Sequence, residues 1–399
     1  MQRDARIDFI RGAGILMIAL DHLGGVAERL APGKFTLLFA TWTRIGWSSA
    51  AEFFVFFSGY LIGLVYARTL QARGPFMLQA RAVHRSWEIY AANVLTLCLT
   101  LALLYATPLG GPTLIEAAQL TQLTGAGAQA SWIGFLTLTT APMFFEILQL
   151  YVVLLLVAPL FLLLARVSAP AAFAVSFSIW LTSQLNPQLN LAAWHFNPFA
   201  WQLVFVLGML CSVGGVVARI DALERRGTIL LVTGGLLLLA FVVKAIDKAG
   251  VVLPVIGAIT IGGIDKGTLD PVRLGHFLVS VVFVMQLVPR SARANTSWPV
   301  QSVARIGRYS LECFCASTIV VYACAGVLYH QTSITTASVA LGGAVLILAI
   351  CAFAVFMEWV RSEPWRGSGV KREDREARFE SKSIEGGATH SSALAARSN

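Results

Sequence analysis

Two ionisable residues in the first apolar segment, Arg11 and His22, carry the clearest chemical signal in the chain. The segment reads RIDFIRGAGILMIALDHL, with Asp21 directly before the histidine. Eleven residues make almost three helical turns, so Arg11 and His22 share one helix face, about 16 Å apart along its axis. Ionisable groups inside an apolar helix are costly unless they face the protein interior or a water-filled cavity, so we expect a functional site here. The alternative is that His22 only hydrogen-bonds a neighbouring span.

Two glycines, Gly14 and Gly25, lie on the same helix face as this pair. Glycine removes side-chain bulk, so the pattern predicts close approach of a ligand or of another backbone at both positions.

Glu52 opens the second apolar segment, in SSAAEFFVFFSGYLIG, at a depth comparable with that of His22. A carboxylate there can orient the imidazole or bind a substrate hydroxyl, and the structural alternative is that it sits at the wet interface. The small residues of SGYLIG are typical of helix packing.

Basic residues mark the ends of the helices that we expect to face the cytoplasm. Arg81 and Arg85 are four residues apart and so share a helical face, and Arg308 opens a later apolar segment. Forked guanidinium groups at a membrane mouth suit a phosphorylated ligand that arrives from the cytoplasm. The alternative is that these arginines only follow the positive-inside rule.

Further polar and aromatic residues gather where other apolar segments begin. They suit carbohydrate, which stacks on aromatic faces and hydrogen-bonds amides, although aromatic belts at a membrane interface have the same composition. We expect these ends to lie on the outer side of the membrane. The residues proposed there for binding a carbohydrate acceptor are Asn197, Trp201, Gln202, Arg273 and His276.

The elements that must position these residues are membrane helices. The chain of 399 residues is 57% hydrophobic and only 13% charged, and its mean hydropathy of +0.72 is far too high for an ordinary soluble domain. Continuously apolar runs disfavour a transmembrane barrel, and we read the first segment as a retained span and not as a signal peptide. We therefore predict an all-α polytopic integral membrane protein with about ten transmembrane helices, at 8–27, 46–67, 87–107, 143–165, 170–185, 198–217, 228–246, 273–289, 309–329 and 337–360.

The distribution of Lys and Arg predicts the topology. These residues gather at the amino terminus, in alternate connections and in the tail, which places both termini in the cytoplasm and the connections 108–142 and 247–272 outside. The net charge of +9 then reflects topology and affinity for anionic membrane lipid, with no sign of nucleic-acid binding. After residue 361 the composition becomes polar, so we expect a membrane domain at 1–361 and a disordered cytoplasmic tail at 362–399.

The six cysteines fall inside apolar segments, where they behave as small buried hydrophobes. Since no Cys or His spacing matches a zinc site, we expect no metal.

Six stretches in order along the chain resemble the OpgC family, membrane acyltransferases that modify osmoregulated periplasmic glucans, within the wider acyltransferase-three superfamily. The arginine–histidine spacing of the first segment is also that of the superfamily. The stretches are DFIRG with DH (Asp8–His22), AAEFFVFFSGY (Ala50–Tyr60), RAVHRSWEIY (Arg81–Tyr90), FNPFAWQLVFVLG (Phe196–Gly208), KGTLDPVRLGHF (Lys266–Phe277) and GRYSLECF (Gly307–Phe314).

The resemblance implies a bacterial inner-membrane enzyme that passes an acyl group, typically succinyl, from cytoplasmic acyl-CoA to a hydroxyl of a periplasmic glucan. It makes His22 the expected catalytic histidine and Arg11 the motif arginine. As a general base His22 would take the hydroxyl proton, with Asp21 or Glu52 fixing its tautomer. Alternatively His22 takes the acyl group first, as a nucleophile.

The donor and acceptor assignments follow from location. We expect Arg11, Arg81, Arg85 and Arg308 to bind acyl-CoA, and the residues at the outer ends to bind the glucan. The alternatives are acetyl transfer to another cell-envelope polysaccharide, a transporter or flippase for an anionic or sugar-linked metabolite, and a scaffold subunit of a glucan-export assembly. The sequence leaves the oligomeric state open.

Overall fold

A computed structural model describes residues 4–35, 38–39, 41–125, 127–189, 191, 194–221, 225–248, 264–288 and 297–365. Within these ranges all regular secondary structure is helical, which confirms the all-α class for the described part of the chain. The elements are α1 (Ala5–Leu30), α2 (Trp42–Ile45), α3 (Ala50–Ala106), α4 (Pro112–Ala117), η1 (Thr121–Leu123), α5 (Ala128–Leu136), α6 (Glu146–Val167), α7 (Ala169–Leu185), η2 (Pro187–Leu189), α8 (Pro198–Val213), α9 (Val216–Asp221), α10 (Arg226–Lys248), α12 (Pro271–Leu287), α13 (Trp298–Arg308), α14 (Ser310–Tyr329) and α15 (Thr336–Arg361).

Among the described residues, six helices are long and apolar enough to cross a membrane, namely α1, α3, α6, α10, α14 and α15. Helices α8 and α12 are shorter apolar helices. Each predicted span overlaps a helix, and α3 covers both the second and the third. The protein is thus a helical membrane protein, while the count of ten spans and the orientation of the termini stay predictions.

Helix α3 contains a sharp bend that divides it into two parts. Gly74 has φ 77° and ψ 178°, and Pro75 follows it. Glycine adopts this conformation without a steric penalty, and proline cannot donate the next helical hydrogen bond. The bend falls between the two apolar runs that the sequence separates.

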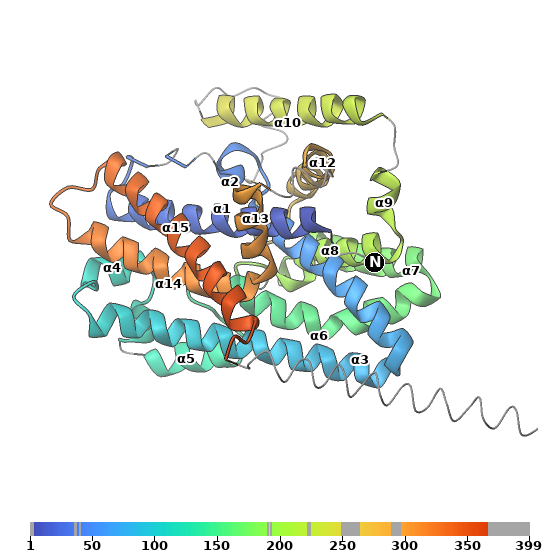
Figure 1. Ribbon diagram of the computed structural model, residues 1–399, viewed down its shortest axis with the longest axis horizontal. Coiled ribbons are helices and arrows are strands. Elements are labelled where there is room, and N and C mark those ends of the chain that lie inside the picture. The colour runs from blue at the N-terminus through green and yellow to red at the C-terminus, as the bar shows by residue number, and fades with distance from the viewer. Residues whose placement is uncertain are drawn as a thin grey trace, which may run out of the picture. The chain divides into compact units, whose positions relative to one another are not determined.

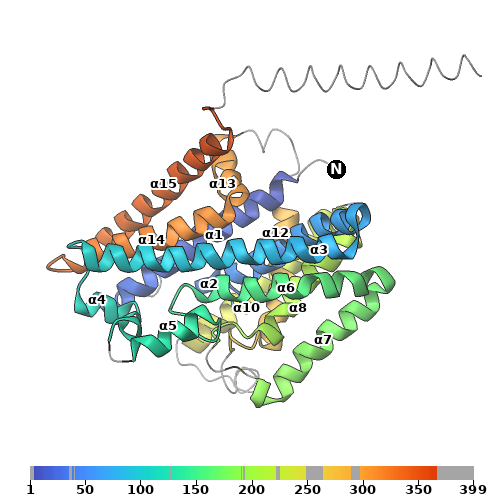
Figure 2. The same cartoon turned by 90° about the horizontal axis from the view of Figure 1, so that it is seen from below.

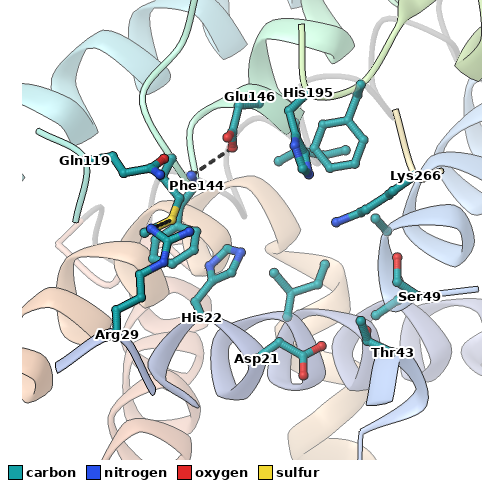
Figure 3. A pocket seen from close by; sticks show the side chains of 16 residues that line it. Asp21, His22, Arg29, Thr43, Ser49, Gln119, Phe144, Glu146, His195 and Lys266 are labelled. Atoms are coloured by element: carbon teal, nitrogen blue, oxygen red, sulfur yellow. Dashed lines mark hydrogen bonds between the residues drawn. The ribbon is translucent and has the colours of Figure 1, made fainter. Parts of the chain in front are cut away.

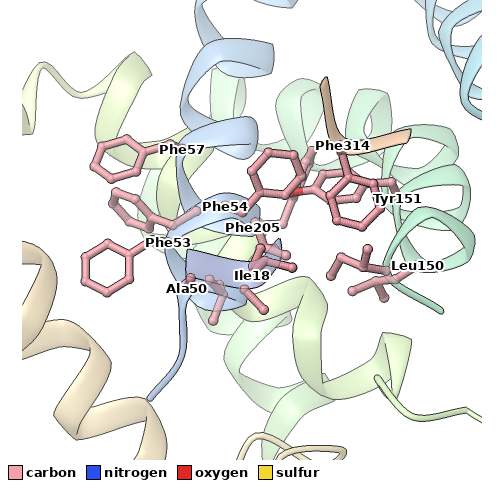
Figure 4. Close-up of a cluster of buried hydrophobic side chains, with 14 of the residues drawn as sticks. Ile18, Ala50, Phe53, Phe54, Phe57, Leu150, Tyr151, Phe205 and Phe314 are labelled. Carbon is pink, nitrogen blue, oxygen red and sulfur yellow. The ribbon is translucent and has the colours of Figure 1, made fainter. Parts of the chain in front are cut away.

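The core that positions the site is a bundle in which α1, α3, α6, α8 and α14 pack on one another (Figures 1 and 2). Phe54 of α3 lies at its centre, edge-on to Tyr151 of α6 at 5.4 Å and stacked on Phe314 of α14 at 6.2 Å. Figure 4 shows these rings beside Ile18 of α1 and Phe205 of α8. Three helices distant in sequence are therefore held together at the level of Phe54.

Two glycines allow α3 and α8 to cross with their backbones in contact. A Cβ atom on Gly59 would overlap the carbonyl of Phe205, and one on Gly208 would overlap the carbonyl of Phe56. The packing role predicted for the small residues of SGYLIG is confirmed at Gly59.

No other backbone approaches closely at the two glycines on the face of Arg11 and His22, and the approach of a ligand there stays a prediction. Nothing lies within 4 Å of a Cβ on Gly25, and the nearest atom to one on Gly14 is the Ala50 carbonyl at 3.9 Å. The tight contact of α1 is instead at Gly12, where a Cβ would overlap the Val303 carbonyl of α13. The tight backbone contact of α1 therefore lies about 100° round the helix from Arg11.

Helix α10 packs on α12 and is otherwise largely exposed (Figure 1). The Arg226 guanidinium donates to the Gln286 carbonyl at 2.6 Å, which ties the two helices together. Large apolar side chains such as Leu231, Leu238 and Phe241 are exposed along it. In water this surface would be costly, whereas in lipid it is the expected outer face of a span.

The connection between α3 and α6 folds into short helices around a small apolar core. Leu120 and Phe135 are buried there against Phe145 and Tyr322. Pro112 at the first turn of α4 suits a helix start, and Gly127 (φ 88°) precedes α5. That the connection at residues 108–142 lies outside the membrane stays a prediction.

The chain divides into two compact units, residues 1–354 and 355–399. The first unit holds the bundle described above. Of the second, residues 355–365 are described and include the end of α15. The predicted tail at 362–399 lies mostly outside the described residues, as do residues 249–263 of the predicted outer connection.

Candidate functional site

The face of α1 that carries His22 borders a cavity of about 410 Å³, which is in the size range of small-molecule sites (Figure 3). Its walls come from α1, the segment before α3, the start of α6 and two loops. The lining residues are Ile18, Asp21, His22, Arg29, Thr43, Ser49, Ala50, Ala51, Gln119, Met143, Phe144, Glu146, Ile147, His195, Phe196 and Lys266.

The imidazole of His22 stacks on the ring of Phe144, with ring centroids 3.7 Å apart and planes inclined by 16°. Stacking holds the ring through its face and leaves the edge nitrogens clear of this contact. In Figure 3 the ring extends from α1 into the cavity. His22 therefore presents a hydrogen-bonding edge to whatever occupies the cavity.

Phe144 adopts an unusual backbone conformation for a bulky residue, with φ 78°. Its backbone N–H donates to the Glu146 carboxylate at 2.8 Å. The preceding residue, Met143, accepts from the Tyr322 hydroxyl at 3.2 Å and contacts Arg29 through its sulfur. A positive φ at phenylalanine is strained, and these contacts of the neighbouring residues hold the backbone in that conformation. The conformation places the Phe144 ring against His22.

The predicted orienting carboxylates are turned away from His22. Asp21 accepts a hydrogen bond from the Thr41 hydroxyl at 2.5 Å and lies 3.7 Å from the guanidinium of Arg44. Figure 3 shows its carboxylate pointing along α1 away from the imidazole. Adjacent residues on a helix project about 100° apart, which is why Asp21 reaches the following loop instead.

Glu52 is fully buried and forms an ion pair with Arg273 of α12. It also accepts from the Ser49 backbone N–H at 2.9 Å and from the Ser49 hydroxyl at 2.5 Å, a capping box at the start of α3. Because the partner of this carboxylate is an arginine of α12, its predicted meeting with His22 is not part of this structure. Either carboxylate would have to leave these partners in order to orient His22.

A second loop brings Lys266 to the cavity, opposite α1. Its ammonium lies over the ring of Phe196, 4.7 Å from the centroid. Burial, followed by the charge of Arg273, lowers the pKa of Lys266 below that of a solvated lysine. Desolvation of the partly exposed His195 ring, together with the Lys266 charge, lowers the pKa of His195 to about 4, so this imidazole is neutral near pH 7.

A smaller cavity of about 170 Å³ lies beside Arg11. Arg11 donates to the Ser310 hydroxyl at 2.5 Å and sits over the ring of Phe54, 5.6 Å from its centroid. Arg85 lines the same cavity and pairs with Glu88 at 2.7 Å. The structure therefore brings two of the four predicted donor arginines to one cavity.

The other two predicted donor arginines are placed differently. Arg81 donates to the Thr69 hydroxyl at 3.0 Å across the bend in α3, which links the two parts of that helix. Arg308 is exposed at the end of α13. Neither is among the described residues that line the smaller cavity.

The same three helices line both cavities. Helix α1 contributes Arg11 to the smaller one and His22 to the larger one. Helix α3 contributes Phe54 to the smaller cavity and Ala51 to the larger one. Helix α6 contributes Leu148 to the smaller cavity and Ile147 to the larger one. Since these pairs on α3 and α6 are at most one turn apart, only about one layer of apolar side chains separates the two cavities.

None of the residues predicted to bind an acceptor is among the described side chains lining the larger cavity. Three of them lie directly behind its wall on α8. Asn197 caps α8 and donates to the Leu189 carbonyl at 2.8 Å, Trp201 donates to the Lys266 carbonyl at 3.0 Å, and Gln202 bonds Ser176 of α7 at 2.6 Å.

The remaining two predicted acceptor residues lie on α12. Arg273 donates to the Ser49 hydroxyl at 3.1 Å, and His276 bonds the Ser48 hydroxyl at 2.7 Å. Both hold the segment that enters α3. In this structure Asn197, Trp201, Arg273 and His276 thus bond segments that form or adjoin the wall, Gln202 joins α8 to α7, and the direct contact of all five with an acceptor stays a prediction.

Lys266, Phe144, Ser49 and Arg29 border the cavity and are not among the site residues predicted from the sequence. Lys266 lies between Asp265 and Gly267, in a stretch that supports the family resemblance. The feature of the sequence that could have identified it is a lysine shortly before an apolar segment. The sequence carries no signal for Phe144, because its role depends on its own backbone conformation and on contact with the imidazole of His22.

The comparisons with known proteins agree with the resemblance in the sequence. A family model described as OpgC protein matches residues 3–362. No curated protein and no solved structure matches the chain.

Proposed function

The chain belongs to the OpgC family, which implies a transferase, and on this premise we propose that it moves a succinyl group from cytoplasmic acyl-CoA to a hydroxyl of a periplasmic glucan. The enzyme would act in the bacterial inner membrane. Acetyl transfer to another envelope polysaccharide is the variant of this proposal with the same chemistry and a different donor.

The observation that carries the proposal is the imidazole of His22, held by Phe144 at the edge of a cavity of small-molecule size. An alcohol is a poor nucleophile near neutral pH, and a histidine in reach of it supplies the base it lacks. Stacking on Phe144 restricts the orientation of the ring.

In the simplest mechanism the acyl group passes directly from CoA to the hydroxyl. His22 takes the hydroxyl proton while the hydroxyl oxygen attacks the thioester carbonyl, the carbon–sulfur bond breaks, and the thiolate of CoA leaves and is protonated. In the alternative, His22 itself attacks the thioester and expels the CoA thiolate. The acyl-histidine then passes the group to the hydroxyl oxygen, and the hydroxyl proton passes through the freed imidazole to the thiolate. Trapping an acylated His22 peptide would favour the second route.

The donor would enter through the smaller cavity. Arg11 and Arg85 line it, and CoA carries phosphates that guanidinium groups bind well. Because α1, α3 and α6 line both cavities, a thioester held there has one apolar layer to pass before it reaches His22.

The test is acyl transfer by the purified protein in lipid vesicles, with succinyl-CoA and a periplasmic glucan, read by mass spectrometry of the glucan. We expect His22→Ala to lower the rate by about 10²- to 10⁴-fold, the range for a lost general base. His330→Ala is the matched control, because His330 caps α14 and is not among the cavity-lining residues. A folded His22→Ala protein within tenfold of the parent would contradict the role of His22, and movement of intact substrate without CoA release would indicate a transporter.

The donor assignment has its own test. We expect Arg85→Ala to weaken apparent affinity for the thioester by on the order of 1–3 kcal/mol, as for a charge-assisted contact, with a smaller effect of Arg308→Ala at the exposed end of α13. The measurement is KM for succinyl-CoA in each variant. Equal KM values in the parent and in both variants would remove these arginines from the donor site.

A further inference from the structure

Lys266 brings a positive charge to the larger cavity from a loop. Among the described residues it forms no ion pair, and its contact there is with the face of Phe196. Figure 3 shows its side chain extending into the cavity from the wall opposite His22. A lysine withdrawn from water without a carboxylate partner is costly, and a bound anion would offset that cost.

The other charged groups on this cavity are already engaged. Asp21 is held by Thr41 and Arg44, and Glu146 accepts the Phe144 N–H. The guanidinium of Arg29 donates to the Ala117 carbonyl at 3.0 Å. His195 is neutral near pH 7. The Ala117 carbonyl leaves the charge of Arg29 in place, so Arg29 and Lys266 are the two cations that line the cavity, and Lys266 is the one whose side chain enters from the wall facing His22.

Two roles for that charge can be distinguished. A donor to the oxyanion of the tetrahedral intermediate must lie about 3 Å from the atom that becomes charged, beside the carbonyl that His22 serves. Lys266 instead enters from the facing wall, on a loop held to α8 through Trp201 and Asn197. Entry from the facing wall suits a ligand with two ends, a carbonyl beside His22 and an anionic group beside Lys266.

We propose that Lys266 forms a subsite for the free carboxylate of a dicarboxylic acyl group, and so selects a succinyl-type donor over acetyl. The inference rests on the proposed acyl transfer and names the residue that reads the acyl group. Phe196 forms the floor of the subsite, where its ring limits access of water to the ammonium and strengthens the contact with a carboxylate.

The experiment compares succinyl-CoA with acetyl-CoA in the parent, in Lys266→Met and in Lys266→Arg. Methionine keeps the length of the stem over Phe196 and removes the charge. We expect Lys266→Met to lower kcat/KM for succinyl-CoA about 10- to 100-fold while the value for acetyl-CoA stays within about threefold, and Lys266→Arg to retain most of the preference. Lys34→Met, at an exposed lysine after α1, is the matched control and should change neither value.

A second readout does not depend on catalysis. Free succinate should raise the Tm of the parent and not that of Lys266→Met, with neutral succinamide as the control ligand. An equal loss with both donors would overturn the subsite and indicate an oxyanion or folding role, and an unchanged donor preference would overturn it as well. If the parent transfers neither group yet succinate still raises its Tm through Lys266, the proposed function fails and the anion subsite remains.

Discussion

At the scale of single residues, polar groups near the site fall into two classes. His22, Lys266 and Ser49 border the cavity, whereas Glu52 and Arg273 are buried against each other behind it. The second class keeps the first in position, because Ser49 bonds both members of the buried pair. Loss of one member leaves the other as an uncompensated buried charge.

Glu52→Gln should therefore act on stability first. We expect a loss of about 3–5 kcal/mol, because Arg273 stays buried without its partner, and a smaller loss in the double variant Glu52→Gln with Arg273→Met. Thermal unfolding in detergent measures this, with Glu116→Gln, at an exposed carboxylate, as the control. If Glu52→Gln is as stable as the parent and yet inactive, Glu52 has the chemical role that its position in the sequence suggested.

At the scale of elements, the site depends on how closely α3 lies against its neighbours. The crossing of α3 and α8 places Asn197 and Trp201 at the start of α8, where they hold the loop of Lys266. The opposite side of α3 contacts α1 and α6, which line both cavities with it. A change in the spacing of α3 and α8 should consequently be felt at Lys266.

Gly59→Ala tests this coupling. The added Cβ would overlap the Phe205 carbonyl, so the helices must separate, at a cost of about 1–3 kcal/mol. We expect a lower Tm and a lower rate of acyl transfer. Gly235→Ala in α10 is the matched control, since nothing lies within 4 Å of its Cβ and alanine favours a helix. Equal Tm values for both variants would show that α3 and α8 can move apart freely.

At the scale of the whole molecule, the basic residues predict which ends of the helices face the cytoplasm. With both termini inside, Arg225 lies at the cytoplasmic side and Glu116 at the periplasmic side. The first apolar segment then carries Arg11 toward the cytoplasm and His22 toward the periplasm.

Single cysteines at positions 116 and 225, in a variant without its native cysteines, test this arrangement. We expect a membrane-impermeant thiol reagent applied to intact cells to label position 116 and to leave position 225 unlabelled until the membrane is permeabilised. Position 116 is exposed, so access should not limit its labelling. The reverse pattern would invert the topology and place His22 near the cytoplasm.

The sequence by itself determined the properties that depend on local periodicity and composition. Continuous apolar runs predict helices, because a chain in lipid must satisfy its backbone hydrogen bonds within each segment. The spacing of Arg11 and His22 likewise places both on one face of α1, and the structure puts a cavity beside each of them. These inferences need only the geometry of one helix.

Only the tertiary structure decided which polar groups face the cavity. Asp21 is adjacent to His22 in sequence and turns to Thr41, whereas Lys266 reaches the cavity from a distant loop. Phe144 meets His22 only because a strained backbone and the contacts of Met143 bring its ring there. Such contacts depend on how separate helices cross, and the crossing of α3 and α8 is set by backbone contact at two glycines, which no single segment encodes.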